Sequence, residues 1–244
     1  MKLLKLNSIL SLVVSALILN INSGCSDKPE VLVITGGHDY DTTEFFSLFF
    51  SDNGISFDTV SQPFANMLIE NNNTENWDVI VFYDMWQEIT KTQKEAYLRL
   101  LENGTGILFL HHSLVSYQDW DEFTSIRGGK YHEKGYGSDS AKLSGYQHDL
   151  DLMITVIDPK NPVTKDIKDF WIHDEGYYNV EILPQVTPLL QTSHPLCARY
   201  VAWTNKYKNS RIVYIMLGHD HQAYKNPSFR QLLTNSINWV SHNN

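Results

Sequence analysis

Short apolar runs alternate with amphipathic segments along this chain, a pattern typical of an α/β sheet. The runs Val31–Thr35, Trp77–Tyr83, Ile107–Leu110 and Arg211–Leu217 are largely apolar, as strands buried on both faces are. Ile55–Val60 alternates apolar and polar residues and predicts one further strand. The order of these strands and their intervening segments predicts a doubly wound, mainly parallel sheet.

Helical spacing and capping residues predict what connects these strands. Phenylalanines recur at helical spacing in Asp41–Asn53, and Thr90–Asn103 begins with a Thr-x-x-Gln capping box. A proline near its first turn marks the start of a final helix at Asn226. Pro162–Phe170 predicts a short helix, whereas the polar, asparagine-rich Gln62–Asn76 predicts a surface connection.

The second half of the chain departs from this alternation. Leu152–Ile157, Val186–Thr192 and Arg199–Thr204 are predicted strands, the last two as antiparallel additions to the sheet. Gly128–Gly145 is glycine-rich and without clear periodicity, which predicts either a lid over a site or a disordered segment. Trp171–Glu181 carries a group of acidic and aromatic residues.

The beginning of the chain predicts a secretory signal over residues 1–24. Lys2 and Lys5 precede the mostly apolar Ile9–Ile21, and small residues precede Cys25. This arrangement resembles the lipobox of bacterial lipoproteins, although Asn22 stands where leucine is usual. We therefore expect secretion across the inner membrane and a lipid anchor on Cys25, in the periplasm or at the outer membrane. Residues 25–30 would be a tether, and residues 31–244 a single α/β domain.

Composition narrows the classes of partner. The formal net charge is −9, and no basic patch with interleaved aromatic residues occurs, so nucleic acid is excluded as a partner. The membrane would be reached only through the lipid anchor. With Cys25 lipidated, Cys197 is the other cysteine of the chain, so a disulfide within one chain is excluded and Cys197 is expected to be a packing residue.

Histidines follow the ends of several predicted strands. His38 follows the first strand, His111 and His112 follow Ile107–Leu110, and His219 and His221 follow the last strand. The carboxyl ends of parallel strands meet at one edge of a sheet, where ligands bind. Imidazoles suit proton transfer near neutral pH and metal binding. The sequence therefore predicts one site at this edge, although a single histidine is more often a structural residue.

Other residues near the strand ends have two interpretations each. Gly37 would let the backbone approach a ligand closely, or would form an ordinary tight turn. Asp84 could orient an imidazole by accepting its second N–H, or could cap the following helix. A zinc-like divalent ion could be held by His38, His111 and His219, but no helical His-x-x-x-His spacing supports it. No other cofactor is predicted.

A second group centres on Glu175, between Asp174 and Tyr177. A carboxylate in partly apolar, aromatic surroundings is a candidate general acid or base. The alternative is a solvated acidic edge. Tyr131 and His132, in the glycine-rich segment, are further candidate ligands.

Four motifs, in this order along the chain, resemble the trehalose-utilisation (ThuA-like) family: Thr35-Gly36-Gly37-His38-Asp39, Phe109-Leu110-His111-His112, His173-Asp174-Glu175-Gly176-Tyr177 and Leu217-Gly218-His219-Asp220-His221. The resemblance implies a flavodoxin-like α/β fold of the glutamine-amidotransferase-like superfamily, without its cysteine nucleophile. It also implies disaccharide metabolism, including 3-keto sugars. The motif residues carried over are His38, His111, His112, Glu175 and His219.

Together these observations predict an envelope carbohydrate-processing enzyme, a hydrolase or lyase that acts on a disaccharide or a 3-keto-glycoside. The expected catalytic residues are His38, His112, Glu175 and His219. The expected substrate contacts are Gly37, Asp84, His111, Tyr131, His132, Tyr177 and His221. Two alternatives stay open: a non-catalytic lipoprotein that binds sugar or protein in the same cleft, and a metal-dependent hydrolase of unrelated substrates.

Overall fold

The computed structural model describes residues 28–50, 55–71, 76–136 and 139–241. The predicted signal and the predicted lipidation at Cys25 lie outside these residues. Within the described ranges, no helix is long and apolar enough to cross a bilayer.

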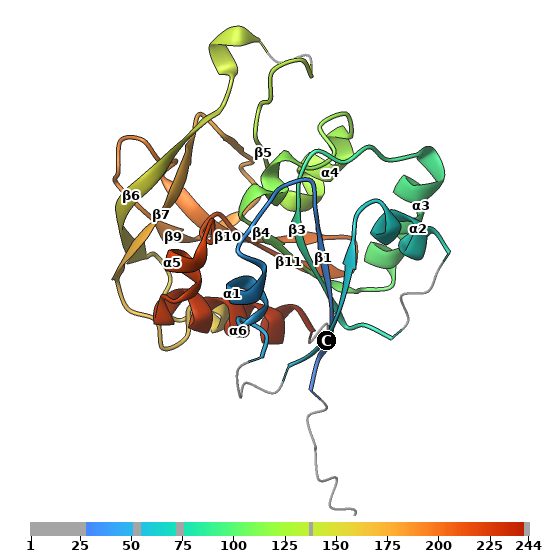
Figure 1. Ribbon diagram of the computed structural model, residues 1–244, viewed down its shortest axis with the longest axis horizontal. Helices are drawn as coiled ribbons and strands as arrows, with labels where there is room; N and C mark the ends of the chain where they lie inside the picture. The colour runs from blue at the N-terminus through green and yellow to red at the C-terminus, as the bar shows by residue number, and fades with distance from the viewer. Residues whose placement is uncertain (1–27, 51–54, 72–75, 137–138, 242–244) are drawn as a thin grey trace, which may run out of the picture.

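A nine-stranded sheet forms the centre of the molecule (Figure 1). Its strand order is β2 (Ser56–Ser61), β1 (Glu30–Gly36), β3 (Val79–Asp84), β4 (Gly106–Leu110), β11 (Ser210–Ile215), β10 (Tyr200–Tyr207), β9 (Thr187–Gln191), β6 (Gly145–Val156) and β7 (Phe170–Tyr178). The strands from β2 to β11 pair in parallel, and those from β11 to β7 pair antiparallel. The predicted α/β sheet, parallel with antiparallel additions, is confirmed.

Helices cover both faces of the parallel strands. They are α1 (Thr42–Phe46), α2 (Phe64–Glu70), α3 (Lys91–Glu102), α4 (Asp121–Arg127), α5 (His221–Tyr224) and α6 (Pro227–Ser241), with 3-10 turns η1 (His111–Val115), η2 (Ser140–Lys142) and η3 (Pro162–Thr164). Every residue of β3 and β4 is buried, which requires cover on both sides of the sheet. The helix α6 packs on β3, β4 and β11, and α4 packs on β10 and β11. In Figure 1, α1, α5 and α6 group together, apart from α2 and α3.

Two connections between the early strands differ from the prediction. The helix expected over Asp41–Asn53 is only the short α1, and residues 51–54 lie outside the described ranges. The surface connection expected over Gln62–Asn76 is wrong, because α2 lies within it and buries Ala65, Asn66 and Ile69. The polar Asn66 made this helix hard to predict. It is buried because its side-chain oxygen accepts hydrogen bonds from the Tyr97 and Tyr117 hydroxyls.

The predictions for the second half were partly right. The helix expected over Pro162–Phe170 is the single turn η3, and the strand expected at Leu152 already begins at Gly145. The glycine-rich Gly128–Gly145 contains η2 and the strand β5 (Gly129–Lys130), which pairs with β8 (Glu181–Ile182). Complete disorder, one of the two alternatives for this segment, is therefore wrong for its described residues, and a lid over the site stays a prediction. η2 projects beyond the sheet at the top of Figure 1.

A buried carboxyl lies where β3 ends. Asp84 is fully buried and accepts hydrogen bonds from the Gln62 amide at 2.9 Å and from the Ser116 hydroxyl at 2.8 Å. Burial raises the pKa of Asp84 to about 6, although the two hydrogen bonds and the charge of Arg127 oppose the shift. The folded protein therefore binds a proton at Asp84 more tightly than the unfolded chain does.

This raised pKa makes a prediction about stability. Because the pKa of Asp84 in the folded protein lies above its ordinary value of 3.8, the stabilising contribution of Asp84 is largest below about pH 4 and is lost as pH rises through 6. Relative to Asp84→Asn, the wild type should lose about 2 kcal/mol of unfolding free energy between pH 4 and pH 7. Urea unfolding of both proteins across this range measures the difference. A difference that does not change with pH contradicts the assignment.

Candidate functional site

A cavity of about 340 Å³ opens where several strands of the sheet end. This volume is within the range of small-molecule sites. The lining residues follow β1, β3, β4 and β11 or belong to β6, β7 and the β5–β6 connection: His38, Met85, Trp86, His111, His112, Val115, Tyr131, Glu133, Tyr146, His148, Glu175, Tyr177 and His219. The structure thus brings together seven of the residues singled out in the sequence: His38, His111, His112, Tyr131, Glu175, Tyr177 and His219.

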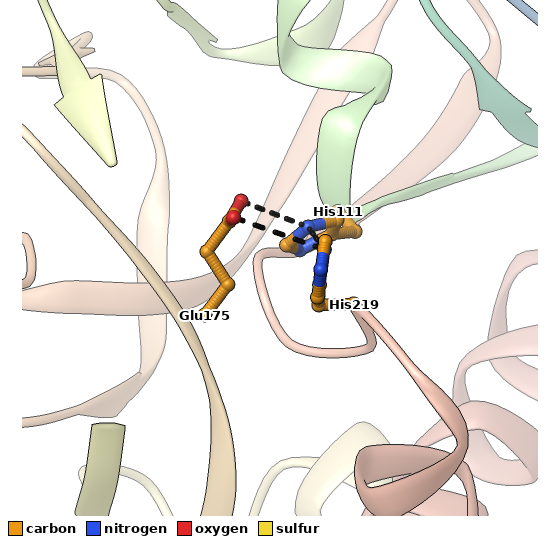
Figure 2. Close-up of side chains that lie close together, drawn as sticks. All are labelled: His111, Glu175 and His219. Carbon is orange, nitrogen blue, oxygen red and sulfur yellow. Dashed lines mark hydrogen bonds and ion pairs between the residues drawn. The ribbon is translucent and has the colours of Figure 1, made fainter. Parts of the chain in front are cut away.

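A His–Glu–His cluster (His111, Glu175 and His219) lies at the bottom of this cavity. His111 Nε2 lies 3.2 Å from His219 Nδ1 and 3.3 Å from a Glu175 carboxylate oxygen. The other Glu175 oxygen lies 3.8 Å from His219 Nδ1. Figure 2 shows the carboxylate of Glu175, which lies on β7, facing the imidazoles of His111 and His219. His111 and Glu175 are buried, so these interactions are only weakly screened by water.

The backbone fixes which nitrogen of His111 faces the cluster. His111 Nδ1 lies 2.6 Å from the carbonyl oxygen of Met216, to which it can only donate. Nε2 is then the nitrogen that carries a lone pair when the ring is neutral. The Tyr177 hydroxyl, 3.0 Å from Nε2, can donate to it, since burial raises the pKa of Tyr177 well above its ordinary value.

His148 lines the cavity beside Glu175, although the sequence analysis did not single it out. Its Nδ1 lies 2.7 Å from Glu175, and its side chain is half exposed. A β-bulge places it there: Gln147 pairs with Gly176 and Leu150 with Asp174, so the two residues between them oppose Glu175 alone. The extra residue switches the face of the strand, so that His148 shares the cavity face with Glu175. The pattern of residues along one strand does not indicate a β-bulge, because the bulge depends on how that strand pairs with its neighbour.

Asp174 positions the loop that carries His219. Its buried carboxylate accepts hydrogen bonds from the backbone N–H groups of Gly218 at 2.7 Å and His219 at 3.0 Å. Burial raises the pKa of Asp174 to about 6, while the nearby His111 and these N–H groups oppose the shift. Of these two neighbouring residues, Glu175 therefore contacts the cavity histidines directly, and Asp174 fixes the backbone of the loop that carries His219. The sequence had offered Asp174 only as part of an acidic group.

His112 and His38 form the side wall of the cavity. Their rings stack at 4.9 Å, and His112 Nε2 lies 3.3 Å from the Tyr83 carbonyl. Burial, together with neighbouring His111 and His38, holds the pKa of His112 well below its usual range, so the ring is neutral at pH 7. In an extended chain, the neighbouring His111 and His112 would point to opposite sides. The 3-10 turn η1 instead brings both to the cavity.

Four predicted substrate contacts are not among the cavity-lining residues: Gly37, Asp84, His132 and His221. His132 forms an ion pair with Glu181, and His221 forms one with Asp41 at 2.7 Å. Gly37 has a positive φ of 84°, and a Cβ there would come within 2.0 Å of the Met85 carbonyl oxygen. Gly37 therefore allows its loop to pass close to the loop that carries Met85. Asp84 belongs to the buried network described above.

The His–Glu–His cluster has a geometry that suits a divalent cation. One ligand atom from each residue lies within 4.8 Å of the others. Tetrahedral zinc with bonds of about 2.0–2.1 Å sets its ligand atoms roughly 3.3 Å apart, close to the distances within the cluster. The hydrogen bond from His111 Nδ1 to Met216 is the kind of outer contact that orients a metal-binding imidazole. Relative to the ligands expected from the sequence, Glu175 takes the place of His38.

The charges in the cluster favour a cation there. Burial, and then His111, lower the pKa of His219 to about 4, so this imidazole is neutral at pH 7. Burial would lower the pKa of His111, but the hydrogen bond and charge of Glu175 raise it above its usual value. Burial would likewise raise the pKa of Glu175, and His111 lowers it. A proton on His111 and a metal ion would therefore compete for the same place beside Glu175.

The free thiol Cys197 lies outside this chemistry. It is buried, and burial raises its pKa to about 12, so it stays protonated at neutral pH. This agrees with the packing role expected from the sequence.

Comparison with known proteins identifies a family. The family model described as ThuA, trehalose utilisation, matches residues 30–240. No curated protein sequence matches the chain significantly.

Solved structures share the fold. A ThuA-like protein from Parabacteroides merdae superposes with a TM-score of 0.73 at 16% identity, over 88% of this chain and 90% of its own. One from Bacteroides uniformis gives 0.65 at 21% identity, over 87% and 92%. PurLQS from Thermotoga maritima gives 0.58 at 12% identity, over 87% and 99%. At these identities the likeness concerns the fold alone.

The cluster geometry predicts zinc binding by these particular side chains. Titration calorimetry with zinc chloride at neutral pH should find one site in the wild type. Glu175→Gln and His219→Ala should each weaken it by about 100-fold or more, because each removes a ligand. His221→Ala is the matched control, a histidine two residues from His219 that pairs with Asp41 instead. Equal affinity in all four proteins would show that zinc binds elsewhere.

Proposed function

This chain belongs to the ThuA family, whose description is trehalose utilisation, and from this premise we propose that it is an enzyme that cleaves 3-keto-disaccharides. Family membership supports a role in carbohydrate metabolism. The proposal goes further and assigns the bond that breaks and the side chains that break it.

The observation that carries the proposal is the shared carboxylate of Glu175. One of its oxygens lies beside His111, and the other lies 2.7 Å from His148 Nδ1. A carboxylate that accepts the Nδ1–H of an imidazole leaves the Nε2 lone pair free to take a proton. Glu175 and His148 would thus act together as a general base, next to the cluster that suits a cation.

The chemistry follows from the acidity of a keto sugar. A ketone at the third sugar carbon acidifies the C–H bond at the second. His148 would remove that proton, and the electron pair would form the double bond between the first and second carbons as the glycosidic C–O bond breaks. The leaving oxygen would take a proton from His38, which lines the same cavity. Water can then add to the double bond, so the overall change is hydrolysis.

Three further parts of the site would support this step. His111, Glu175 and His219 would hold a divalent cation, which supplies Lewis-acid polarisation of the ketone oxygen. Asp174 would keep His219 in place through the backbone of its loop. The neutral His112 would pack beneath His38 and help to orient it.

A comparison of two histidine variants tests the catalytic assignment. His148→Ala should lower kcat for 3-keto-trehalose by about 10²–10⁴-fold, the usual effect of removing a general base. His173→Ala is the matched control, because His173 is also partly exposed and bonded to a carboxylate, Asp151, but does not line the cavity. It should keep kcat within about twofold of the wild type.

Product analysis and chelation complete this test. The wild type should release glucose from 3-keto-trehalose, and treatment with a chelator should abolish the reaction until zinc is restored. Absence of turnover by the zinc-loaded wild type overturns the proposed function. Equal loss in His148→Ala and His173→Ala overturns the role of His148.

We also propose that the protein is anchored in the cell envelope by lipid on Cys25, which supports action on sugars outside the cytoplasm. Cys25→Ser should shift the protein from the membrane fraction to the soluble envelope fraction, because it removes the acylated thiol. Fractionation of cells that express both forms measures this. Membrane association of both forms in equal amounts contradicts the anchor.

A further inference from the structure

We call three of the more exposed lining residues the aromatic rim: the rings of Trp86 and Tyr146, and the Glu133 carboxylate beside Trp86. All three residues line the cavity, and they come from three separate segments: the turn after β3, the β5–β6 connection and β6. Trp86 is 50% exposed and Tyr146 is 55% exposed. The buried residues below carry the chemistry, whereas these exposed rings offer flat apolar surface to a ligand.

Trp86 is held in place at a cost to the backbone. Its φ of 49° lies in the left-handed region, which bulky residues rarely adopt. Such strain persists where the surrounding structure imposes it, and it concentrates at functional sites. The indole N–H also donates to the Glu133 carboxylate at 3.4 Å. The turn thus presents a large ring beside a carboxylate with remaining capacity to accept hydrogen bonds.

The start of β6 contributes a further part of the rim. Tyr146 pairs with Tyr177 across the strands and therefore shares the face of Glu175. Its ring lies 5.1 Å from His148, which lies 4.9 Å from His219. A line of rings therefore leads from the mouth of the cavity to the cluster.

From this arrangement we propose that the aromatic rim binds the second sugar ring of the substrate, the one that leaves. A pyranose has a flat C–H face that packs on an aromatic ring, and hydroxyls at its edge that can donate to a carboxylate. A wholly apolar ligand would not use the remaining capacity of the Glu133 carboxylate to accept hydrogen bonds. An anionic ligand would meet Glu133, Glu175 and a protein of net charge −9. The assignment rests on the proposed function, because it takes the reacting sugar to lie over the cluster.

Binding of trehalose, measured without turnover, tests the rim. Trehalose should quench or shift the tryptophan fluorescence of the wild type, and the response should disappear in Trp86→Ala. Affinity should fall about tenfold or more in Trp86→Ala, recover in part in Trp86→Phe, and fall several-fold in Glu133→Gln. Trp171→Ala is the matched control, since Trp171 is 65% exposed and does not line the cavity. It should bind trehalose as the wild type does.

Kinetics with 3-keto-trehalose separate this proposal from the proposed function. Trp86→Ala should raise KM about tenfold while kcat changes little, because the ring binds substrate away from the reacting atoms. Trehalose binding that depends on Trp86, without turnover of the keto sugar, keeps the rim and overturns the function. Unchanged affinity and KM in Trp86→Ala, or no binding of trehalose to the wild type, overturns the rim.

Discussion

The site depends on the burial of one carboxylate among imidazoles. Glu175 is only 5% exposed, and its carboxylate oxygens lie 2.7–3.8 Å from ring nitrogens of His111, His148 and His219. A buried charge is tolerated only where partners replace the water it has lost. Histidine is an unusual choice for this purpose because its own charge depends on a proton. The environment of Glu175 therefore favours either a proton or a metal ion beside its carboxylate.

Three different parts of the fold provide these partners. The carboxyl end of β4 supplies His111 through a 3-10 turn, in which the residue has a φ of 44°. The loop after β11 supplies His219, held by the carboxylate of Asp174. The antiparallel hairpin of β6 and β7 supplies Glu175 and, through a bulge, His148. The parallel strands alone would give histidines without the carboxylate, so the antiparallel addition completes the site.

The strands and the histidines at their ends could be read from the sequence, because strand burial and strand polarity are local patterns. Three features could not. The helix α2 buries the polar Asn66, whose partners Tyr97 and Tyr117 are distant in the chain. His148 reaches the cavity through a bulge, which depends on pairing with β7. Trp86 lines the cavity from a strained turn, which no spacing of residues indicates.

We propose that His111, Glu175 and His219 enclose one cation position. Anomalous diffraction at the zinc absorption edge, from crystals grown with zinc, would locate the ion. We expect a peak about 2.0–2.2 Å from His111 Nε2, His219 Nδ1 and a Glu175 oxygen. No peak within the cluster, or a zinc ion bound only at other residues, would contradict it.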